Sequence, residues 1–265
     1  QTPDHILPGT SFLIREKLNL NSSCIAMDLN QGCAGYIYGL SAISTFMSSI
    51  KAKKGLLLVG DTITKLISPE DNSLIPVFSD AGTATAIEYD ENADDIYFDL
   101  CADATGYDAI IVPDGGARNP INLDSLEIKK VNEKIKRAPI HLTMNGHDVF
   151  NFGFTKVAPS IPAFMKAINI TSDDVDYLIL HQANKLLNES IRKKAGFTPE
   201  KVPYSIEKYG NTSCATIPLT IVSELKDRVY NKQTSFILTG FGVGLSWGNA
   251  YIKTERLVCS SVIEI

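Results

Sequence analysis

The chain has 265 residues, of which 44% are hydrophobic and 21% are charged. This is the composition of an ordinary globular protein, so it excludes general disorder and allows a substantial buried core. The formal net charge of −5 argues against a nucleic-acid-binding protein. No apolar run is long enough to cross a bilayer, so we expect no membrane partner.

The five cysteines are odd in number and form no Cys-x-x-Cys pair. We therefore expect neither a disulfide framework nor a metal site. The first residues, Gln1–His5, show no signal-peptide pattern. A reducing, cytoplasmic location is the expectation that fits these observations.

The N-terminal part begins with a predicted strand, turn and helix. An apolar run at Cys24–Leu29 is followed by a glycine turn at Asn30–Gly35 and by an amphipathic stretch at Tyr36–Ile50. Leu56–Gly60 predicts a buried strand, and Pro76–Ile87 predicts a further strand-and-turn segment. The order of these elements already indicates strands that alternate with helices.

The middle of the chain is less regular. Residues Gly106–Lys136 contain a strong loop signal at Asp114–Pro120, and we take this stretch as the join between two halves. The predicted division places residues 1–136 in the first half and residues 137–265 in the second. A helix near Gly153–Ile168 is expected to open the second half.

The second half continues with a short strand, Tyr177–Leu180, and a helix, Lys185–Ala195, for which Gly196 is the predicted C-cap. Ser235–Thr239 and Leu245–Lys253 predict paired strands around a glycine turn. The alternation of strands and helices indicates an α/β architecture, and strands this apolar are expected to be covered on both faces.

Cys33 stands at the predicted start of the first long helix. A helix N-terminus carries partial positive charge and unpaired N–H groups, so a thiol there is expected to lose its proton more easily. The thiolate is the nucleophilic form of cysteine. The alternative is a small buried hydrophobic side chain, which is a common role of free cysteine.

His181 follows the strand Tyr177–Leu180 directly, at a strand-to-helix turn where open α/β sheets place functional groups. By itself it could equally be a satisfied hydrogen-bonding residue. Three other histidines have less informative surroundings and are expected to be structural or exposed; they are His5, His141 and His147.

Asn211 precedes an apolar helical stretch at Cys214–Val229. Taken alone, an asparagine in this position is an ordinary turn or N-cap residue. Together with Cys33 and His181, however, it completes a Cys, His, Asn set in that order.

Two chemistries use such a set. In papain-type proteases the histidine activates the thiol, but the sequence around Cys33 lacks that family's signature. In decarboxylating condensation the thiolate takes an acyl group, and neutral His and Asn donate hydrogen bonds to a developing enolate oxygen.

Several separate motifs resemble β-ketoacyl-acyl-carrier-protein synthase III, the initiating condensing enzyme of the thiolase-like superfamily. The resemblance runs from about His5 to Lys253, with every motif in the family's order. The motifs are Asn30–Gly35, Val77–Gly82, Met144–Gly146, His181–Asn184, Tyr209–Ser213 and Gly240–Gly248.

The resemblance implies an α/β thiolase-like fold of two related halves, each of a layered α-β-α-β-α type. It implies that Cys33 is the acyl-accepting nucleophile of the first half, while His181 and Asn211 of the second half stabilise the enolate. The backbone N–H groups of Cys33 and Val243 would form the acyl oxyanion hole. Val243 replaces a glycine common in the family, so the hole requires that its backbone adopt the needed angles.

The resemblance also implies partners and a pocket. Phe241 would pack beside the cysteine, and Leu7 aligns with a position that reaches into the acyl pocket of a second subunit of a homodimer. An acidic acyl carrier protein is the expected partner in fatty acid biosynthesis. Its docking patch would use the basic side chains after His181, namely Lys185, Arg192, Lys193 and Lys194. The alternative is a solvated helix end with favourable dipole charges.

No cofactor is implied, because acyl-coenzyme A or a carrier's acyl-phosphopantetheine is a substrate. The family's opening segment is absent, so the first half is expected to be incomplete, and Asn72 stands where the family has a coenzyme-A-contacting arginine. The choice between a coenzyme A and a carrier-protein donor therefore stays open, as does the acyl chain.

Two other functions remain as alternatives. An acyltransferase could pass the acyl group from Cys33 to an alcohol or amine, with His181 as a general base. A non-catalytic partner subunit is also known among condensing-enzyme relatives, but there the nucleophile or the enolate-binding pair is lost, whereas all three residues are present here.

Overall fold

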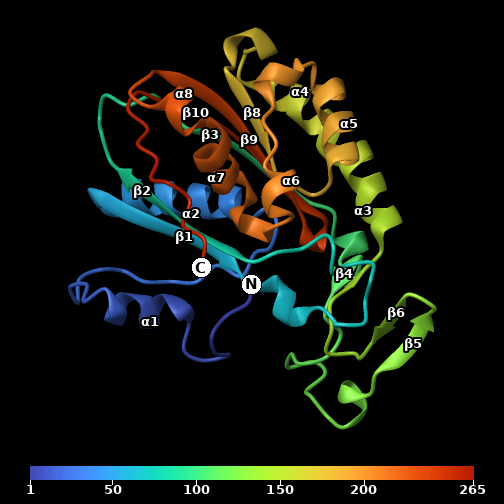
Figure 1. Cartoon of the computed structure of the whole chain (residues 1–265). Coiled ribbons are helices and arrows are strands. Elements are labelled where there is room, and N and C mark those ends of the chain that lie inside the picture. The colour runs from blue at the N-terminus through green and yellow to red at the C-terminus, as the bar shows by residue number, and fades with distance from the viewer.

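The computed structural model describes residues 1–265 as a layered α/β molecule (Figure 1). The helices are α1 (Thr10–Lys17), α2 (Gly35–Ile50), α3 (Gly146–Phe152), α4 (Ala158–Ala167), α5 (Lys185–Ala195), α6 (Ile206–Tyr209), α7 (Thr216–Thr220) and α8 (Lys226–Val229). The strands are β1 (Lys54–Asp61), β2 (Ala81–Glu88), β3 (Tyr97–Ala102), β4 (Ile110–Ile111), β5 (Lys129–Asn132), β6 (Ile135–Arg137), β7 (Thr143–Met144), β8 (Tyr177–Leu180), β9 (Thr234–Gly242) and β10 (Ser246–Thr254).

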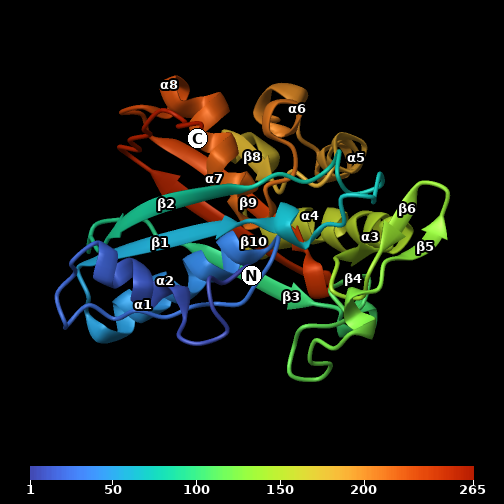
Figure 2. The same ribbon diagram turned by 60° about the horizontal axis from the view of Figure 1, so that its bottom comes forward.

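The central element is a four-stranded sheet in the order β3-β10-β9-β8. Strands β8 and β9 run parallel, whereas β10 is antiparallel to both of its neighbours. Strands β1 and β2 form a separate antiparallel pair, and so do β4 with β7 and β5 with β6. In Figure 2, α3, α4 and the β5–β6 hairpin lie on the right of the molecule, away from α1 and the β1–β2 pair on the left.

Helix α2 lies between the β1–β2 pair and the central sheet. Its Ile37 and Leu40 belong to a buried cluster with Ile179 and Phe236 of the sheet, and Leu57 of β1 packs against that cluster. Because successive strand residues point to opposite faces, one strand can contribute to two cores.

The opposite face of the sheet is covered by α4 and α5. Leu178 and Leu180 of β8 point into this second core, where they meet Ile161 of α4 and Leu187 of α5. Strand β8 is therefore covered on both faces, as its unbroken apolar sequence predicts.

Most of the predicted elements are confirmed. Helix α2, strand β8 and helix α5 have the predicted positions, and Gly196 caps α5 in the left-handed region with φ of 79°. Strands β9 and β10 pair around the glycine turn. The helix expected near Gly153 begins earlier, at Gly146, and is α-helical on both sides of a π-helical turn at Gly153–Val157.

Two predictions were wrong. Residues Cys24–Leu29 form no strand, and Ile25, Met27 and Leu29 are exposed, because no neighbouring strand lies within hydrogen-bonding reach of them. Strand β1 is covered on one face only: Leu56 and Leu58 are 45% and 40% exposed, since no layer lies on the outer face of the β1–β2 pair. Hydrophobicity alone did not reveal which face would have a neighbour.

The division at residue 136 stays a prediction. Strand β3, from the first range, pairs with β10 and so forms the edge of a sheet whose other strands come from the second range. No helix of the structure combines the length and the apolar character needed to cross a membrane.

Candidate active site

Cys33 lies in the turn that leads into α2, two residues before the helix begins. Only 6% of its surface is exposed. The Gly35 N–H donates to the Gly32 carbonyl and closes this turn. The turn packs tightly against the end of β9, where a Cβ built on Gly242 would lie 2.7 Å from the Cys33 sulfur. Glycine at position 242 therefore allows the β9 turn to approach the thiol.

The expectation that the helix start would lower the pKa of Cys33 was wrong. Burial raises the pKa of this thiol to about 11, the Asp61 carboxylate adds to the rise, and hydrogen bonds from the Val243 N–H and Ser213 oppose it. Since burial disfavours the charged thiolate, the resting site holds a neutral thiol.

Both backbone groups expected in the oxyanion hole point to the sulfur. The N–H groups of Val243 and of Cys33 itself each act as hydrogen-bond partners of the thiol. Val243 has a negative φ, unlike Gly242 and Gly244 on either side, so its side chain causes no backbone strain. The replacement of glycine by Val243 therefore leaves the donor in place.

His181 is fully enclosed at the end of β8, with 1% of its surface exposed. Its backbone N–H donates to Thr239 of β9 at 2.8 Å, and its ring meets the Phe241 ring edge-on at a centroid separation of 5.4 Å. Burial lowers the pKa of His181 to about 3, which the Ser213 backbone opposes only in part. The imidazole is therefore neutral at physiological pH.

Asn211 lies beside the segment that leads into β2, where its backbone N–H donates to the Val77 carbonyl and its carbonyl accepts from the Ser79 N–H. Its side-chain Oδ1 accepts from the Ser213 N–H at 2.9 Å. This bond closes a turn, one of the two structural roles that the sequence suggested for Asn211, whereas the N-cap position is occupied by Thr212. The bond also fixes the amide, because Oδ1 is occupied and Nδ2 is left without a protein acceptor. Nδ2 is thus available as a donor to a substrate.

These groups suit hydrogen-bond donation better than general-base catalysis. Because burial raises the pKa of the thiol and lowers the pKa of the imidazole, proton transfer from Cys33 to His181 is disfavoured in the resting site. A neutral imidazole and a free amide NH₂ can instead both donate to a negatively charged oxygen. The site is therefore arranged for oxyanion stabilisation next to a nucleophile.

The two acyl-pocket residues lie in different surroundings. Phe241 is 1% exposed and packs against His181 within a large core cluster, whereas Leu7 is 84% exposed in the N-terminal segment. Their role in binding an acyl chain stays a prediction.

The four basic residues expected to dock a carrier protein are not equivalent. Lys185 pairs with Glu207, and Lys194 lies over the Phe154 ring, 4.8 Å from its centroid. Arg192 is 8% exposed, and its guanidinium donates to Glu189 and to the Phe197 carbonyl. The prediction for Arg192 was wrong, because its side chain is committed to holding the end of α5, which the sequence could not show.

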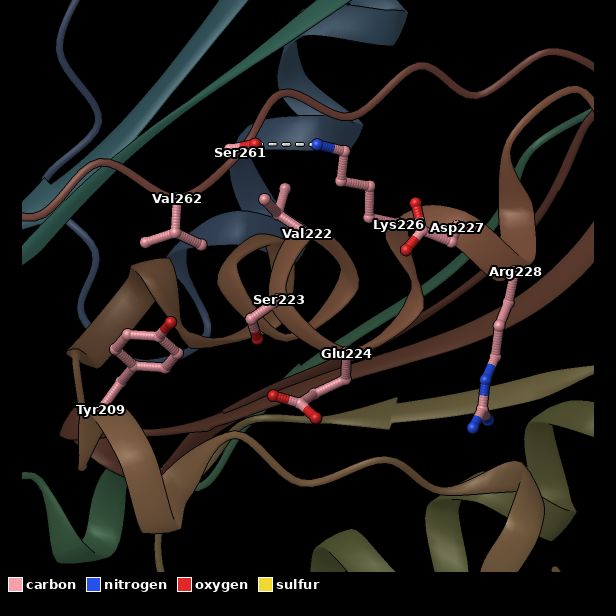
Figure 3. A pocket seen from close by; sticks show the side chains of 9 residues that line it. All are labelled: Tyr209, Val222, Ser223, Glu224, Lys226, Asp227, Arg228, Ser261 and Val262. Atoms are coloured by element: carbon pink, nitrogen blue, oxygen red, sulfur yellow. Dashed lines mark hydrogen bonds between the residues drawn. The ribbon is translucent and has the colours of Figure 1, made fainter.

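A separate surface hollow lies between Tyr209, α8 and the C-terminal segment (Figure 3). Its lining is mostly polar, and the Lys226 ammonium bridges it by donating to Ser261 Oγ at 2.8 Å. None of Cys33, His181 and Asn211 lines this hollow, so it is distinct from the candidate active site.

Sequence reasoning missed several residues that surround the three candidates. Asp61 is buried beside Cys33 and Cys214, and Ser213 contacts the Cys33 thiol. Thr216 Oγ1 lies 2.7 Å from His181 Nδ1. Their types are ordinary for turns and helix starts, so only their position in space reveals the contact.

Comparison with known proteins places these residues in a family. The family model described as 3-oxoacyl-[acyl-carrier-protein (ACP)] synthase III matches residues 27–104, and its C-terminal counterpart matches residues 165–254. The first match contains Cys33, and the second contains His181 and Asn211.

Individual relatives agree. The chain is 31% identical over 256 residues to the β-ketoacyl-[acyl-carrier-protein] synthase III of Natranaerobius thermophilus, a match that covers 95% of this chain and 75% of the relative. It is 32% identical to a putative 3-oxoacyl-[acyl-carrier-protein] synthase 3 of Campylobacter jejuni, a match that covers 99% of this chain and 73% of the relative. The crystal structure of a 3-oxoacyl-(acyl-carrier protein) synthase from Burkholderia xenovorans superposes with a TM-score of 0.91 at 38% identity, covering 100% of this chain and 74% of that one.

Proposed function

This chain belongs to the 3-oxoacyl-acyl-carrier-protein synthase III family, and we propose that it catalyses the decarboxylating condensation of an acyl thioester with a malonyl-acyl carrier protein. It is an enzyme of the condensing transferase type with a thiolase-like fold. The chain spans about three quarters of the length of these relatives.

In the first step the Cys33 sulfur attacks the acyl thioester carbonyl. The Cys33–acyl bond forms as the donor's C–S bond breaks, and the thiol proton leaves with the donor as its free thiol. The N–H groups of Cys33 and Val243 would hold the oxyanion of the tetrahedral intermediate, since both already approach the sulfur. The negative charge of the intermediate therefore develops on an oxygen that these two N–H groups can stabilise.

In the second step a malonyl thioester loses carbon dioxide and becomes an enolate. His181 and Asn211 Nδ2 would donate hydrogen bonds to the enolate oxygen. The enolate carbon attacks the Cys33 thioester and forms the β-ketoacyl product, and the released sulfur takes up one proton. Neither step requires a cofactor, because both acyl groups arrive as substrates.

The observation that carries this proposal is the pair of neutral donors beside a buried thiol. Asn211 Oδ1 is held by Ser213, so its amide presents Nδ2, and His181 is kept neutral by burial. A general base would need the opposite property, a ring that accepts a proton near neutral pH.

The proposal is tested by separating the two steps. The protein is incubated with acyl-coenzyme A and acyl-carrier thioesters, and the adduct is sought by intact mass; carbon dioxide release from a malonyl thioester is measured in parallel. We expect an acyl adduct that Cys33→Ala abolishes, together with malonyl-dependent carbon dioxide release. Acyl transfer to an alcohol or amine without carbon dioxide release would overturn the proposal in favour of an acyltransferase.

We further propose that Lys193 and the neighbouring lysines dock the acidic carrier protein. Lys193 is exposed near the end of α5 and has no ion-pair partner. Lys193→Glu is expected to raise the KM for carrier-bound substrate and leave the KM for a small thioester unchanged, and added salt should shrink the difference. Lys232→Glu, at a lysine that is also exposed and lies before β9, is the matched control. Equal effects of the two variants would contradict the assignment.

We also propose that the enzyme is a homodimer in which Leu7 reaches the partner's acyl pocket. The exposure of Leu7 leaves it free for such a contact. Light scattering gives the oligomeric state, and a monomer at micromolar concentration would refute this proposal.

A further inference from the structure

The second ring nitrogen of His181 has a specific partner. Nδ1 lies 2.7 Å from Thr216 Oγ1, and both residues are 1% exposed, so no water competes for this contact. A neutral imidazole carries one proton, on Nδ1 or on Nε2, and the group that faces one nitrogen selects the tautomer. Thr216 therefore decides whether Nε2 donates or accepts a hydrogen bond in the active site.

The Thr216 hydroxyl has one proton and two possible acceptors. It lies 2.7 Å from His181 Nδ1 and 3.0 Å from the Ser213 carbonyl. The Ser213 carbonyl already accepts the backbone N–H of Thr216, so it does not depend on the hydroxyl. Nδ1 has no other donor among its hydrogen-bond partners.

The separation is compatible with the hydroxyl as the donor. The distance of 2.7 Å between Nδ1 and Oγ1 lies within the range of a short hydrogen bond in either direction, so the partners of the two groups decide the donor. With the hydroxyl proton directed to Nδ1, both Nδ1 and the Ser213 carbonyl have a donor.

We propose that Thr216 is a positioning residue that donates to His181 Nδ1 and thereby holds the imidazole proton on Nε2, from which it can donate a hydrogen bond to the enolate oxygen. This inference rests on the proposed function, because the need for an Nε2 donor arises in the decarboxylation step. It predicts that the Thr216 hydroxyl affects decarboxylation and leaves acylation of Cys33 unaffected.

Thr216 is itself held in place. It is the first residue of α7, and its carbonyl accepts from Thr220 Oγ1 at 2.8 Å, while that hydroxyl also contacts Ser205 Oγ at 2.7 Å. On the other side the Phe241 ring meets the imidazole edge-on and limits its rotation. The contact between Thr216 and His181 is thus fixed by rigid neighbours on both sides.

The tautomer can be measured without any activity assay. Two-bond ¹H–¹⁵N correlation spectra of histidine-labelled protein distinguish the two neutral forms, and His181→Ala identifies the signal of His181. His141 is an internal reference, because the Ala138 N–H donates to its Nδ1 at 2.9 Å and so requires the Nε2–H form of the neutral ring. We expect wild type to show His181 as the Nε2–H tautomer, and the Nδ1–H tautomer in wild type would overturn the proposal.

Two variants then separate the hydroxyl from the shape of the side chain. Thr216→Val keeps the branched shape and removes the hydroxyl, whereas Thr216→Ser keeps the hydroxyl. In Thr216→Val we expect loss of the Nε2–H form and decarboxylation slower by about 10²-fold, as for the loss of one oxyanion donor, with Cys33 acylation unchanged. Thr216→Ser should retain both the tautomer and the rate.

Decarboxylation in Thr216→Val that is as fast as in Thr216→Ser would overturn the proposal. If Thr216→Val does not fold, the wild-type and Thr216→Ser spectra still decide it. If the wild-type enzyme shows the Nε2–H tautomer but releases no carbon dioxide from a malonyl thioester, the proposed function fails while the assignment of Thr216 stands.

Discussion

Replacing Asn211 by aspartate changes one atom of the site and tests the role of Nδ2 directly. The Oδ1 atom of Asn211 accepts from the Ser213 N–H at 2.9 Å, and an aspartate oxygen can take over that bond. The second oxygen then stands where Nδ2–H stood. An ionised carboxylate has no proton to donate, and its charge repels the enolate where Nδ2–H would have stabilised it.

The expected size follows from the loss of one donor. Removing a hydrogen-bond donor from an oxyanion site costs about 2.7–4 kcal/mol, which corresponds to a rate that is about 10²–10³-fold lower. The fold should be preserved in Asn211→Asp. Asn211→Ala, in contrast, leaves the buried Ser213 N–H without an acceptor, which costs about 1–3 kcal/mol of unfolding free energy.

The assay measures three quantities for wild type, Asn211→Asp and Asn211→Ala. Intact mass gives the rate of Cys33 acylation, carbon dioxide release gives malonyl decarboxylation, and urea denaturation gives stability. We expect unchanged acylation in both variants, strongly reduced decarboxylation in both, and reduced stability in Asn211→Ala alone. Decarboxylation by Asn211→Asp at the wild-type rate, or a loss of acylation before any loss of decarboxylation, would refute the reasoning.

Three other predictions concern the thiol, its glycine neighbour and an acid-sensitive pair. Because burial raises the pKa of Cys33 to about 11, iodoacetamide at pH 7 should label Cys33 about 10²-fold more slowly than a thiol at the ordinary value of 9.0. Labelling of Cys33 as fast as that of the exposed Cys24 would contradict this. Gly242→Ala would place a Cβ 2.6 Å from the Cβ of Cys33, so we expect slower acylation of Cys33 and a loss of about 1–3 kcal/mol of unfolding free energy. Gly116→Ala is the control, because its added Cβ meets no atom within 4 Å, and it should change neither quantity. Hydrogen bonds from Arg192 and then Tyr204 lower the pKa of Glu189 from 4.5 to about 2, so this carboxylate stabilises the fold above pH 4.5 and the contribution is lost as the pH falls toward 2. Between pH 4.5 and pH 3, Glu189→Gln should therefore lose less unfolding free energy than wild type in urea titrations. An identical loss in the two proteins would show that the Glu189–Arg192 pair does not cause the acid sensitivity.

Local sequence was sufficient where the signal and its cause lie in the same segment. Helix α5 has its N-cap Asn184, its C-cap Gly196 and its amphipathic pattern within thirteen consecutive positions, so its bounds were predicted correctly. Strand β8 is apolar throughout, and β9 is apolar over Phe236–Leu238, as expected for strands that are covered on both faces. The segment before Cys33 shows the limit of such patterns, since Ile25 and Met27 have strand-like neighbours in sequence but no strand beside them in space.

The sequence by itself determined the α/β class, the order of Cys33, His181 and Asn211, and the family, because residue types and their spacing carry that information. Only the tertiary structure decided the state of these groups. Burial makes Cys33 a neutral thiol and His181 a neutral ring, and both effects depend on residues that are distant in the chain. It also placed Thr216 against His181 from 35 residues away and, outside the site, directed the Arg192 guanidinium to the Phe197 carbonyl at the end of α5. Desolvation and hydrogen bonding act through space, so one-dimensional patterns identify the reacting residues but leave their protonation to be fixed by the fold.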